Sequence, residues 1–137
     1  QDDIRLSFKS SSGTIPLVVN TSGVITTANS SKRYKENIKP VEDAVLDPNG
    51  LYDVQVCQYN YKPEYKDNEL VSGTQIGVIA EDLDKHYPNA VIYDSEGRPE
   101  SWQDRIMIPA MLKLIQDQKK QLDALQAEVD ALKAKLQ

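Results

Sequence analysis

The feature that most constrains this chain is a regular apolar repeat near its C-terminal end. Nine positions recur at alternating steps of three and four residues: Ile108, Met111, Ile115, Gln118, Leu122, Leu125, Val129, Leu132 and Leu136. Such a heptad pattern predicts one long helix whose narrow seam packs against identical helices. A single amphipathic helix lying on its own domain is the alternative.

Charges beside the seam favour a parallel arrangement of the helices. Glu128 falls at a g position and Lys133 at the following e position, where parallel coiled coils form ion pairs between chains. The mixture of Ile, Leu and Val in the seam does not choose between two and three chains. Gln118 is a polar residue in the seam and would help to set the register.

The first part of the sequence predicts short strands. Between residues 4 and 30, β-prone residues alternate with Ser, Thr, Gly and Asn, and turns are expected at Ser12-Gly13 and Ser22-Gly23. This segment has too few apolar residues to fold alone. Strands from identical neighbouring chains are its simplest partners, so we expect an N-terminal β-strand segment that trimerises.

The middle of the chain predicts a small α/β core, which makes the fold class α+β. Apolar spacing predicts a helix over 36–46, stopped by the turn residues that follow Pro48. Residues 51–63 predict a strand with Tyr59 and Tyr61 on one face. Residues 74–101 predict, in order, a strand, a short helix, a strand and a turn.

Composition argues against several classes of function. The net charge is -5 with a pI near 4.9, which does not suit a general nucleic-acid binder. No apolar run is long enough to cross a membrane, and the start is not a signal peptide. With one cysteine, Cys57, and one histidine, His86, we expect no metal site, and without a Gly-rich phosphate loop we expect no cofactor. We also expect the protein to be made in a reducing cytoplasm.

Three segments of the sequence carry a family resemblance. They are SSKRYKENIKP at 30–40, GVIAEDLDKHYPNAV at 77–91 and DRIMIPAMLKLIQDQKKQL at 104–122. In that order they resemble the S-D-x-R-x-K-x-N-I-x-P, G-V-I-A-Q-E and D-Y-x-x-L-I-P motifs of the intramolecular chaperone, or peptidase S74, domain. In that family the domain lies at the C-terminus of phage endosialidase tailspikes, neck appendages and L-shaped tail fibres. Ser31 stands where the family has aspartate.

The resemblance implies a domain that directs homotrimerisation of the fibre ahead of it and then cuts itself off. The scissile bond would join Asn29 to Ser30, with Ser30 as the nucleophile and Lys35 as its base. Three residues of the matched segments are candidate supporting residues: Arg33, Asn37 and Glu81. The trimer seam would comprise Ile115, Gln118, Leu122, Leu125, Val129 and Leu132.

Three parts follow from this interpretation. Residues 1–29 would be the end of a fibre or appendage β-stalk, residues 30–107 the chaperone core and residues 108–137 the coiled-coil helix. The expected partners are two further copies of the chain and the fibre region before it, with neither nucleic acid nor membrane. Assembly would take place in the host cytoplasm, and the mature fibre would be carried on the virion.

Self-cleavage at Ser30 can also be argued from general chemistry, without the family resemblance. A serine hydroxyl attacks only when a base takes its proton, and a lysine is a base only in its neutral form. The neighbouring cations Lys32 and Arg33 would favour that form by repulsion. Because Ser30 directly follows the carbonyl that it attacks, an intramolecular shift of the acyl group from nitrogen to oxygen would leave an ester for water to hydrolyse.

Other interpretations stay open. From spacing alone, Ser30 and Ser31 are better explained as helix caps, with Lys35 and Glu36 in the first turns, and the resemblance is what favours catalysis. A permanent trimerisation tip without proteolytic activity is the second functional hypothesis. A general serine protease is the third, although no Ser-His-Asp set is present.

Three further residues receive structural interpretations. His86 precedes Tyr87-Pro88 at the end of the predicted short helix, where a cation suits the helix dipole. Trp102 and Tyr59 are expected in the core rather than as stacking platforms for a ligand. None of these residues is therefore expected to take part in the chemistry.

Overall fold

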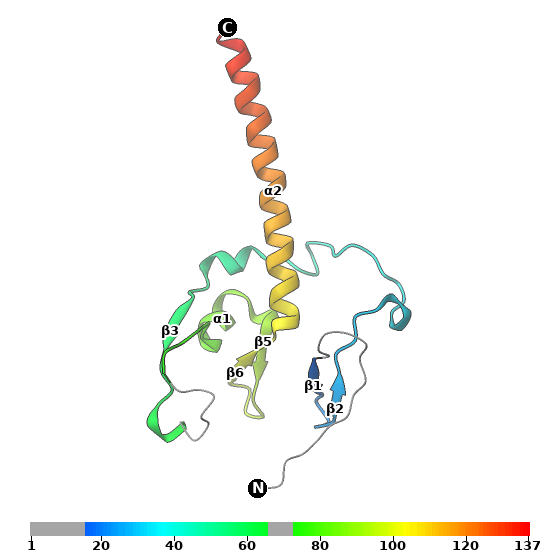
Figure 1. Cartoon of the computed structure of the whole chain (residues 1–137), viewed down its shortest axis with the longest axis vertical. Coiled ribbons are helices and arrows are strands. Elements are labelled where there is room, and N and C mark those ends of the chain that lie inside the picture. Colours follow the sequence, from blue (N-terminus) through cyan, green and yellow to red (C-terminus); the bar gives the residue numbers. More distant parts are fainter. Residues whose placement is uncertain (1–15, 66–72) are drawn as a thin grey trace. The chain divides into compact units, whose positions relative to one another are not determined.

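A computed structural model describes residues 16–65 and 73–137 of the chain. The described residues fall into two compact units, one ending at Pro40 and the other beginning at Val41. Figure 1 shows the elements of both units in order along the sequence. The α+β class is confirmed, because small antiparallel sheets are combined with a long C-terminal helix.

The first unit contains a β-hairpin. Strands β1 (Leu17–Val19) and β2 (Ile25–Thr27) pair antiparallel. The Asn20 side chain closes the turn, because its Oδ1 accepts the backbone N–H groups of Ser22 and Val24, and Gly23 takes a positive φ of 76°. Strands and a turn at Ser22-Gly23 are confirmed here. The turn predicted at Ser12-Gly13 lies outside the described residues.

The helix predicted over 36–46 is wrong. Proline disfavours the helical conformation of the residue before it, so Pro40 interrupts the pattern. Asn37 takes a left-handed φ of 54°, which also breaks a helix. What remains is one turn, in which the backbone N–H groups of Val45 and Leu46 donate to the Glu42 carbonyl.

Two short antiparallel sheets form the body of the second unit. Strand β3 (Cys57–Tyr59) pairs with β4 (Gln75–Gly77), and β5 (Val91–Tyr93) pairs with β6 (Pro99–Trp102). The strand expected over 51–63 is therefore reduced to its middle residues.

Short helices connect these strands. Helix α1 (Ala80–His86) lies between β4 and β5, so the predicted order of strand, helix, strand and turn is confirmed. The 3-10 helices are η2 (Asn49–Asp53), η3 (Pro63–Tyr65) and η5 (Pro88–Ala90). In η2, a Cβ on Gly50 would collide with the backbone carbonyl of His86, so only glycine allows this close approach to α1.

Helix α2 (Asp104–Lys135) follows β6 at once and confirms the predicted long helix. The Gln103 backbone N–H donates to the Ala90 carbonyl, while the Gln103 carbonyl accepts the N–H groups of Ile106 and Met107. This exchange fixes the start of the helix beside the end of η5. No helix of the described chain is long and apolar enough to cross a membrane.

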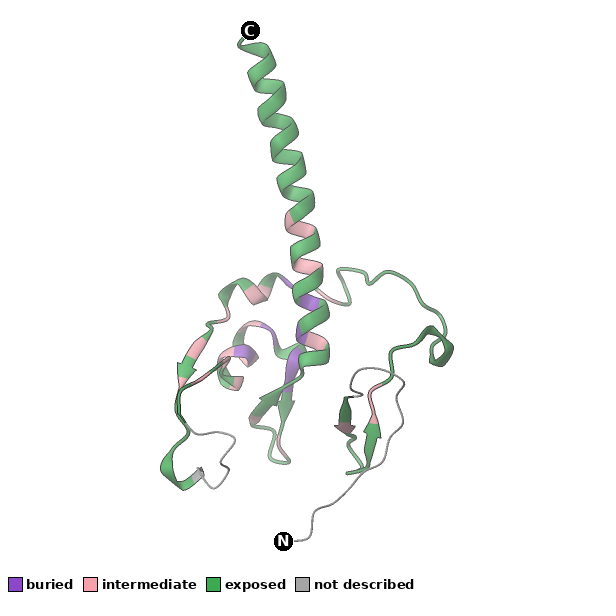
Figure 2. Cartoon of the chain, in the orientation of Figure 1, coloured by how far each residue is buried: buried purple, intermediate pink, exposed green. Residues whose placement is uncertain are grey.

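The core of the second unit is small and lies at the base of α2. Figure 2 shows the buried residues there, whereas the far part of α2 is exposed throughout. Six apolar residues are buried in one cluster: Leu83, Tyr87, Ala90, Val91, Met107 and Ala110. Among the described residues, the buried part of the helix thus lies near its beginning, and every residue of α2 from Lys119 on is exposed.

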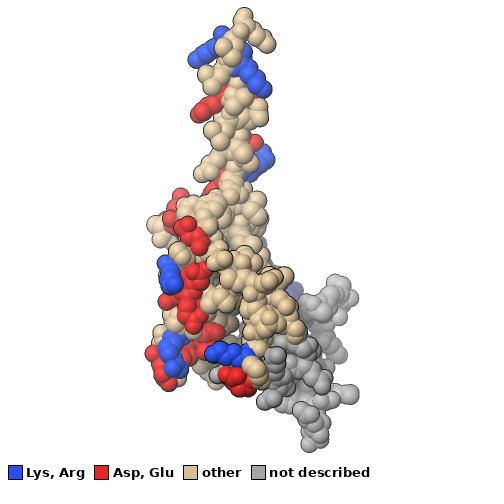
Figure 3. Space-filling view, turned by 90° about the vertical axis from the view of Figure 1, so that its left-hand side faces the viewer, with Lys and Arg blue, Asp and Glu red and all other residues tan. Residues whose placement is uncertain are grey.

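Charged side chains fasten the turn after Pro40 to α2. The Lys113 Nζ lies 2.7 Å from Asp43 and 2.9 Å from Asp117, and only 15% of the Lys113 side chain is exposed. The hydrogen bonds to Asp43 and then Asp117 raise the pKa of Lys113 above its usual value. On the face shown in Figure 3, acidic groups gather over the globular part, and charges of both signs mix along the helix.

Candidate functional site

The hairpin of the first unit leads directly to the predicted cleavage junction. The Ala28 N–H donates to the Pro16 carbonyl just beyond the paired strands. The Asn29 side chain then donates from Nδ2 to the Thr27 Oγ1 over 3.1 Å. The chain leaves the sheet after these bonds, so the Asn29-Ser30 peptide follows an ordered, hydrogen-bonded end of β2.

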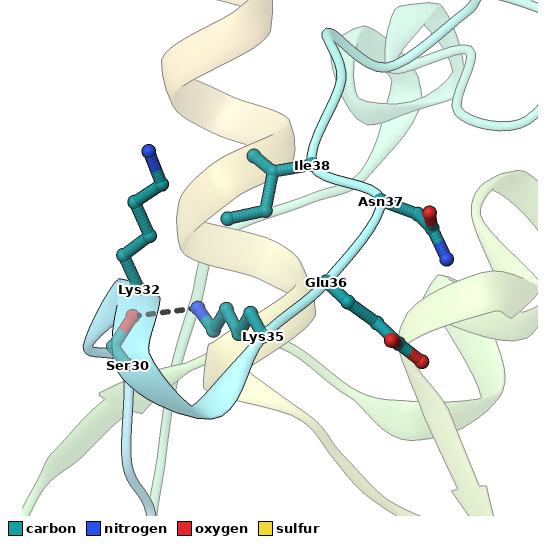
Figure 4. A pocket seen from close by; sticks show the side chains of 6 residues that line it. All are labelled: Ser30, Lys32, Lys35, Glu36, Asn37 and Ile38. Carbon is teal, nitrogen blue, oxygen red and sulfur yellow. Dashed lines mark hydrogen bonds between the residues drawn. The ribbon is translucent and has the colours of Figure 1, made fainter.

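A single 3-10 turn brings Lys35 back to Ser30. This turn, η1 (Lys32–Tyr34), is closed by the backbone bond from the Lys35 N–H to the Lys32 carbonyl. The Lys35 Nζ donates to the Ser30 Oγ over 3.1 Å, the contact drawn in Figure 4. Ser31 occupies the N-cap position but makes no side-chain capping bond. The serine hydroxyl therefore meets the lysine amine rather than the start of a helix.

This contact lies in an open hollow of about 610 Å³. Its lining consists of Ser30, Lys32, Lys35, Glu36, Asn37 and Ile38, all of them exposed. Figure 4 shows the Glu36 and Asn37 side chains pointing away from the Ser30-Lys35 contact. The hollow is thus accessible to water on the isolated chain, and no carboxylate of its lining points at the lysine.

The candidate supporting residues are placed differently from one another. The Arg33 guanidinium lies over the Tyr34 ring, 4.7 Å from its centroid. Asn37, within the motif, takes a left-handed φ of 54°, a conformation that asparagine tolerates better than most residues. Glu81 lies in α1 of the second unit and lines a separate hollow with Tyr59 and Tyr61. Their support for catalysis stays a prediction.

Two lining residues were not singled out from the sequence. Lys32 was considered only as a nearby cation, and Ile38 only as part of a helix that does not form. Both belong to the first motif. Lys32 begins the turn that ends at Lys35, and an extended path for 35–40 would have placed Ile38 beside Lys35. Pro40 and its restriction on the preceding residue were the signal for that path.

Other predicted positions resolve as follows. His86 ends α1, with its Nε2 3.7 Å from Asp82 Oδ1. The rings of Tyr59 and Tyr61 meet edge to face at 5.6 Å, in accord with their predicted common face. Trp102 is 39% exposed and Tyr59 is half-buried outside the core cluster, so the prediction of both as core residues is wrong. Among the residues described, no three His, Cys, Asp or Glu side chains gather as metal ligands would.

The described residues thus combine an α+β fold, an exposed serine-lysine contact that follows a hairpin, and a long helix whose distal apolar residues are exposed. Residues 30–92 match the family of the chaperone of endosialidase, Peptidase S74. The resemblance inferred from the sequence is thereby confirmed over this segment, which begins at Ser30. A search of curated proteins found no match to the chain.

The match supports a chaperone role, and the peptidase name of the family suggests a domain that cleaves itself. It ends before the third resembling segment at 104–122, which α2 contains. The first two resembling segments are thus covered by the family match, whereas the resemblance of the helix stays a prediction.

Proposed function

We propose that this chain is the C-terminal intramolecular chaperone of a phage tail fibre, tailspike or appendage, which drives homotrimerisation and is released by self-cleavage between Asn29 and Ser30. The observation that carries the proposal is the 3.1 Å contact between Lys35 Nζ and Ser30 Oγ, at the first residue of the family match. Assembly would take place in the host cytoplasm, and the fibre would remain on the virion.

The chemistry uses two side chains and one water molecule. Neutral Lys35 takes the proton of the Ser30 hydroxyl as its Oγ attacks the Asn29 carbonyl carbon. The tetrahedral intermediate expels the Ser30 amide nitrogen, which takes the proton back from Lys35, and the Asn29 acyl group remains as an ester on Oγ. Water then hydrolyses the ester, giving an Asn29 carboxylate and a chain that begins with the free amine of Ser30.

Assembly is expected to complete the site. A lysine acts as a base when exclusion of water or a nearby cation keeps its amine neutral. Lys35 and every other residue lining the hollow are exposed in the single chain. Exclusion of water therefore has to come from neighbouring chains, so cleavage follows trimerisation. This order keeps the chaperone attached until its work is done.

The trimer itself rests on the open helix seam. Leu122, Leu125 and Leu132 are exposed on α2 by more than half, so their apolar side chains are available to neighbouring helices. Joining three such helices raises the local concentration of the fibre ends and lowers the entropic barrier to aligning their strands. After cleavage the fibre cannot regain the lost chaperone, so it is trapped kinetically in its folded state.

Mass spectrometry of the purified chain tests the cleavage. The unmodified chain should yield a fragment that begins at Ser30, and Ser30→Ala should remain whole because its nucleophile is gone. Ser31→Ala is the matched control, since its hydroxyl makes no capping bond, and it should still be cut. If Ser30→Ala is cut at the same bond, an external protease is responsible and self-cleavage is refuted.

A permanent trimerisation tip is the second candidate. The observation in its favour is Ser31, which replaces the aspartate of the resembled motif beside the proposed nucleophile. This candidate predicts a folded trimer whose unmodified chain remains whole. Deleting residues 108–137 from a full-length fibre tests what both candidates share.

Both the chaperone and the tip require the helix, so the shortened fibre should aggregate. A soluble trimeric fibre made without the helix would contradict the chaperone hypothesis.

A further inference from the structure

An apolar groove of about 490 Å³ runs beside the base of α2. One wall carries Val56, Ile76 and Trp102, and the other is α2 itself with Met107, Ile108 and Met111. Val56 is 71% exposed and Ile76 is 79% exposed, so the wall opposite the helix is strongly apolar and open to solvent. Exposed apolar surface of this kind marks an interaction site.

The heptad register places the groove on one side of the helix seam. Ile108 and Met111 are a and d positions, so Met107, directly before Ile108, is a g position. The groove therefore lies along the g side of α2. Leu112 follows Met111 and is an e position, on the other side of the seam, where 55% of it is exposed.

Leu112 is an exception among the e positions of α2. The other residues at this position are charged or polar: Arg105, Lys119, Gln126 and Lys133. An apolar side chain there adds nothing to the strict seam, and its own chain leaves it exposed. Leu112 is thus available to an apolar partner on another chain.

Parallel coiled coils bring such a partner into place. In them a g residue of one helix lies beside the e residue five positions later in its neighbour. Glu128 and Lys133 have this offset and carry opposite charges, which favours the parallel alignment. Met107 and Leu112 have the same offset at the base of the helix, where both are apolar.

We propose that Leu112 of a second copy of this chain seats in the groove beside Met107. The inference rests on the trimer of the proposed function and adds a contact between each helix and the globular part of its neighbour. Among the e residues, Leu112 lies level with the apolar wall of the groove, whereas Arg105 precedes the first apolar helix residue of that wall, Met107. Lys119, Gln126 and Lys133 lie beyond the groove. Each copy would thus hold the base of the next helix as well as its seam.

Trp102 provides the measurement, because it lines the groove and is the one tryptophan of the sequence. In the unmodified trimer we expect a blue-shifted emission and protection from acrylamide quenching. Leu112→Asp should remove the protection while sedimentation still shows a trimer held by the distal seam. Gln116→Asp, an exposed position one turn further along α2, is the matched control and should behave as the unmodified chain.

The double variant Leu125→Asp, Leu132→Asp supplies the monomer reference for free Trp102. If the unmodified chain is a trimer but its Trp102 is as accessible as in that reference, the groove contact is refuted and the trimer stands. Protection that persists in a trimeric Leu112→Asp also refutes the contact. A monomeric unmodified chain refutes the trimer along with the contact. Should Leu112→Asp dissociate the trimer, Leu112→Ala provides the same comparison.

Discussion

The segment from Ser30 to Pro40 and the core around Leu83 are stabilised in opposite ways. Every residue of 30–40 is exposed, and η1 and the Ser30-Lys35 bond give it a local shape. The core buries six apolar side chains against α1 and the base of α2. The difference means that the core makes its buried contacts within the single chain, whereas the proposed chemistry would need surroundings that the proposed assembly supplies.

The largest effect expected from this comparison is on assembly. Replacing Leu125 and Leu132 with aspartate places charges in a seam that would otherwise be buried, so trimers should be lost completely in sedimentation equilibrium. Cleavage should stop with them, because the water-excluding neighbours are gone. Far-UV circular dichroism should still show the folded core. A variant that stays trimeric would show that the seam is assigned wrongly.

The next effect falls on the chemistry alone. Lys35→Ala removes the base and should slow cleavage by about 10²- to 10⁴-fold, measured as the fraction of cut chain over time. The free energy of unfolding should not change, because Lys35 is exposed and does not belong to the buried cluster. Lys39→Ala is a nearby control that keeps Lys35 and should cleave at close to the original rate. Unchanged cleavage in Lys35→Ala would refute its role as base.

A core substitution should show the reverse pattern. Leu83 is fully buried, so Leu83→Ala should reduce the free energy of unfolding by about 2–5 kcal/mol in urea titration of the trimer-deficient chain. Lys85→Ala, an exposed position on the same helix, is the control and should change it little. If the two variants unfold alike, the cluster around Leu83 is not what stabilises the second unit.

The comparison also explains what could be predicted from sequence. The heptads identified α2 because one period runs through the whole helix, and turn residues located the hairpin at Ser22-Gly23. The 36–46 helix failed because apolar spacing was weighted above the backbone restrictions of Pro40 and Asn37.

Contacts between segments far apart in the sequence could not be predicted from the sequence. The Gln118 Nε2, predicted in the trimer seam, donates to the Tyr52 hydroxyl of its own chain over 2.9 Å. These two residues are far apart in sequence, and neither the heptad period nor the local pattern around η2 indicates that they meet. The Ser30-Lys35 contact is local, since only a single short turn separates its residues, yet the spacing alone favoured helix caps and the family resemblance was what pointed to this pair.

The smallest expected effect concerns one polar atom within the core. Tyr87 is 3% exposed, and its hydroxyl has no hydrogen-bond partner among the residues described. Burial, and then the charge of Asp47, raise the pKa of Tyr87 above its ordinary value of about 10. A raised pKa means that the neutral hydroxyl is favoured in the folded state, so this contribution is present below pH 10 and is lost as the pH rises through the folded-state pKa.

Tyr87→Phe should therefore keep or raise the free energy of unfolding at pH 7, by up to about 1 kcal/mol, because it removes a buried polar group that lacks a partner. It should also weaken the loss of stability above pH 10, measured by thermal unfolding across the alkaline range. Tyr52→Phe is the control, since the Tyr52 hydroxyl is exposed and accepts a bond from Gln118. A clear destabilisation by Tyr87→Phe at pH 7 would mean that the hydroxyl has a partner in the assembled protein, and would place that part of the core with the regions that assembly completes.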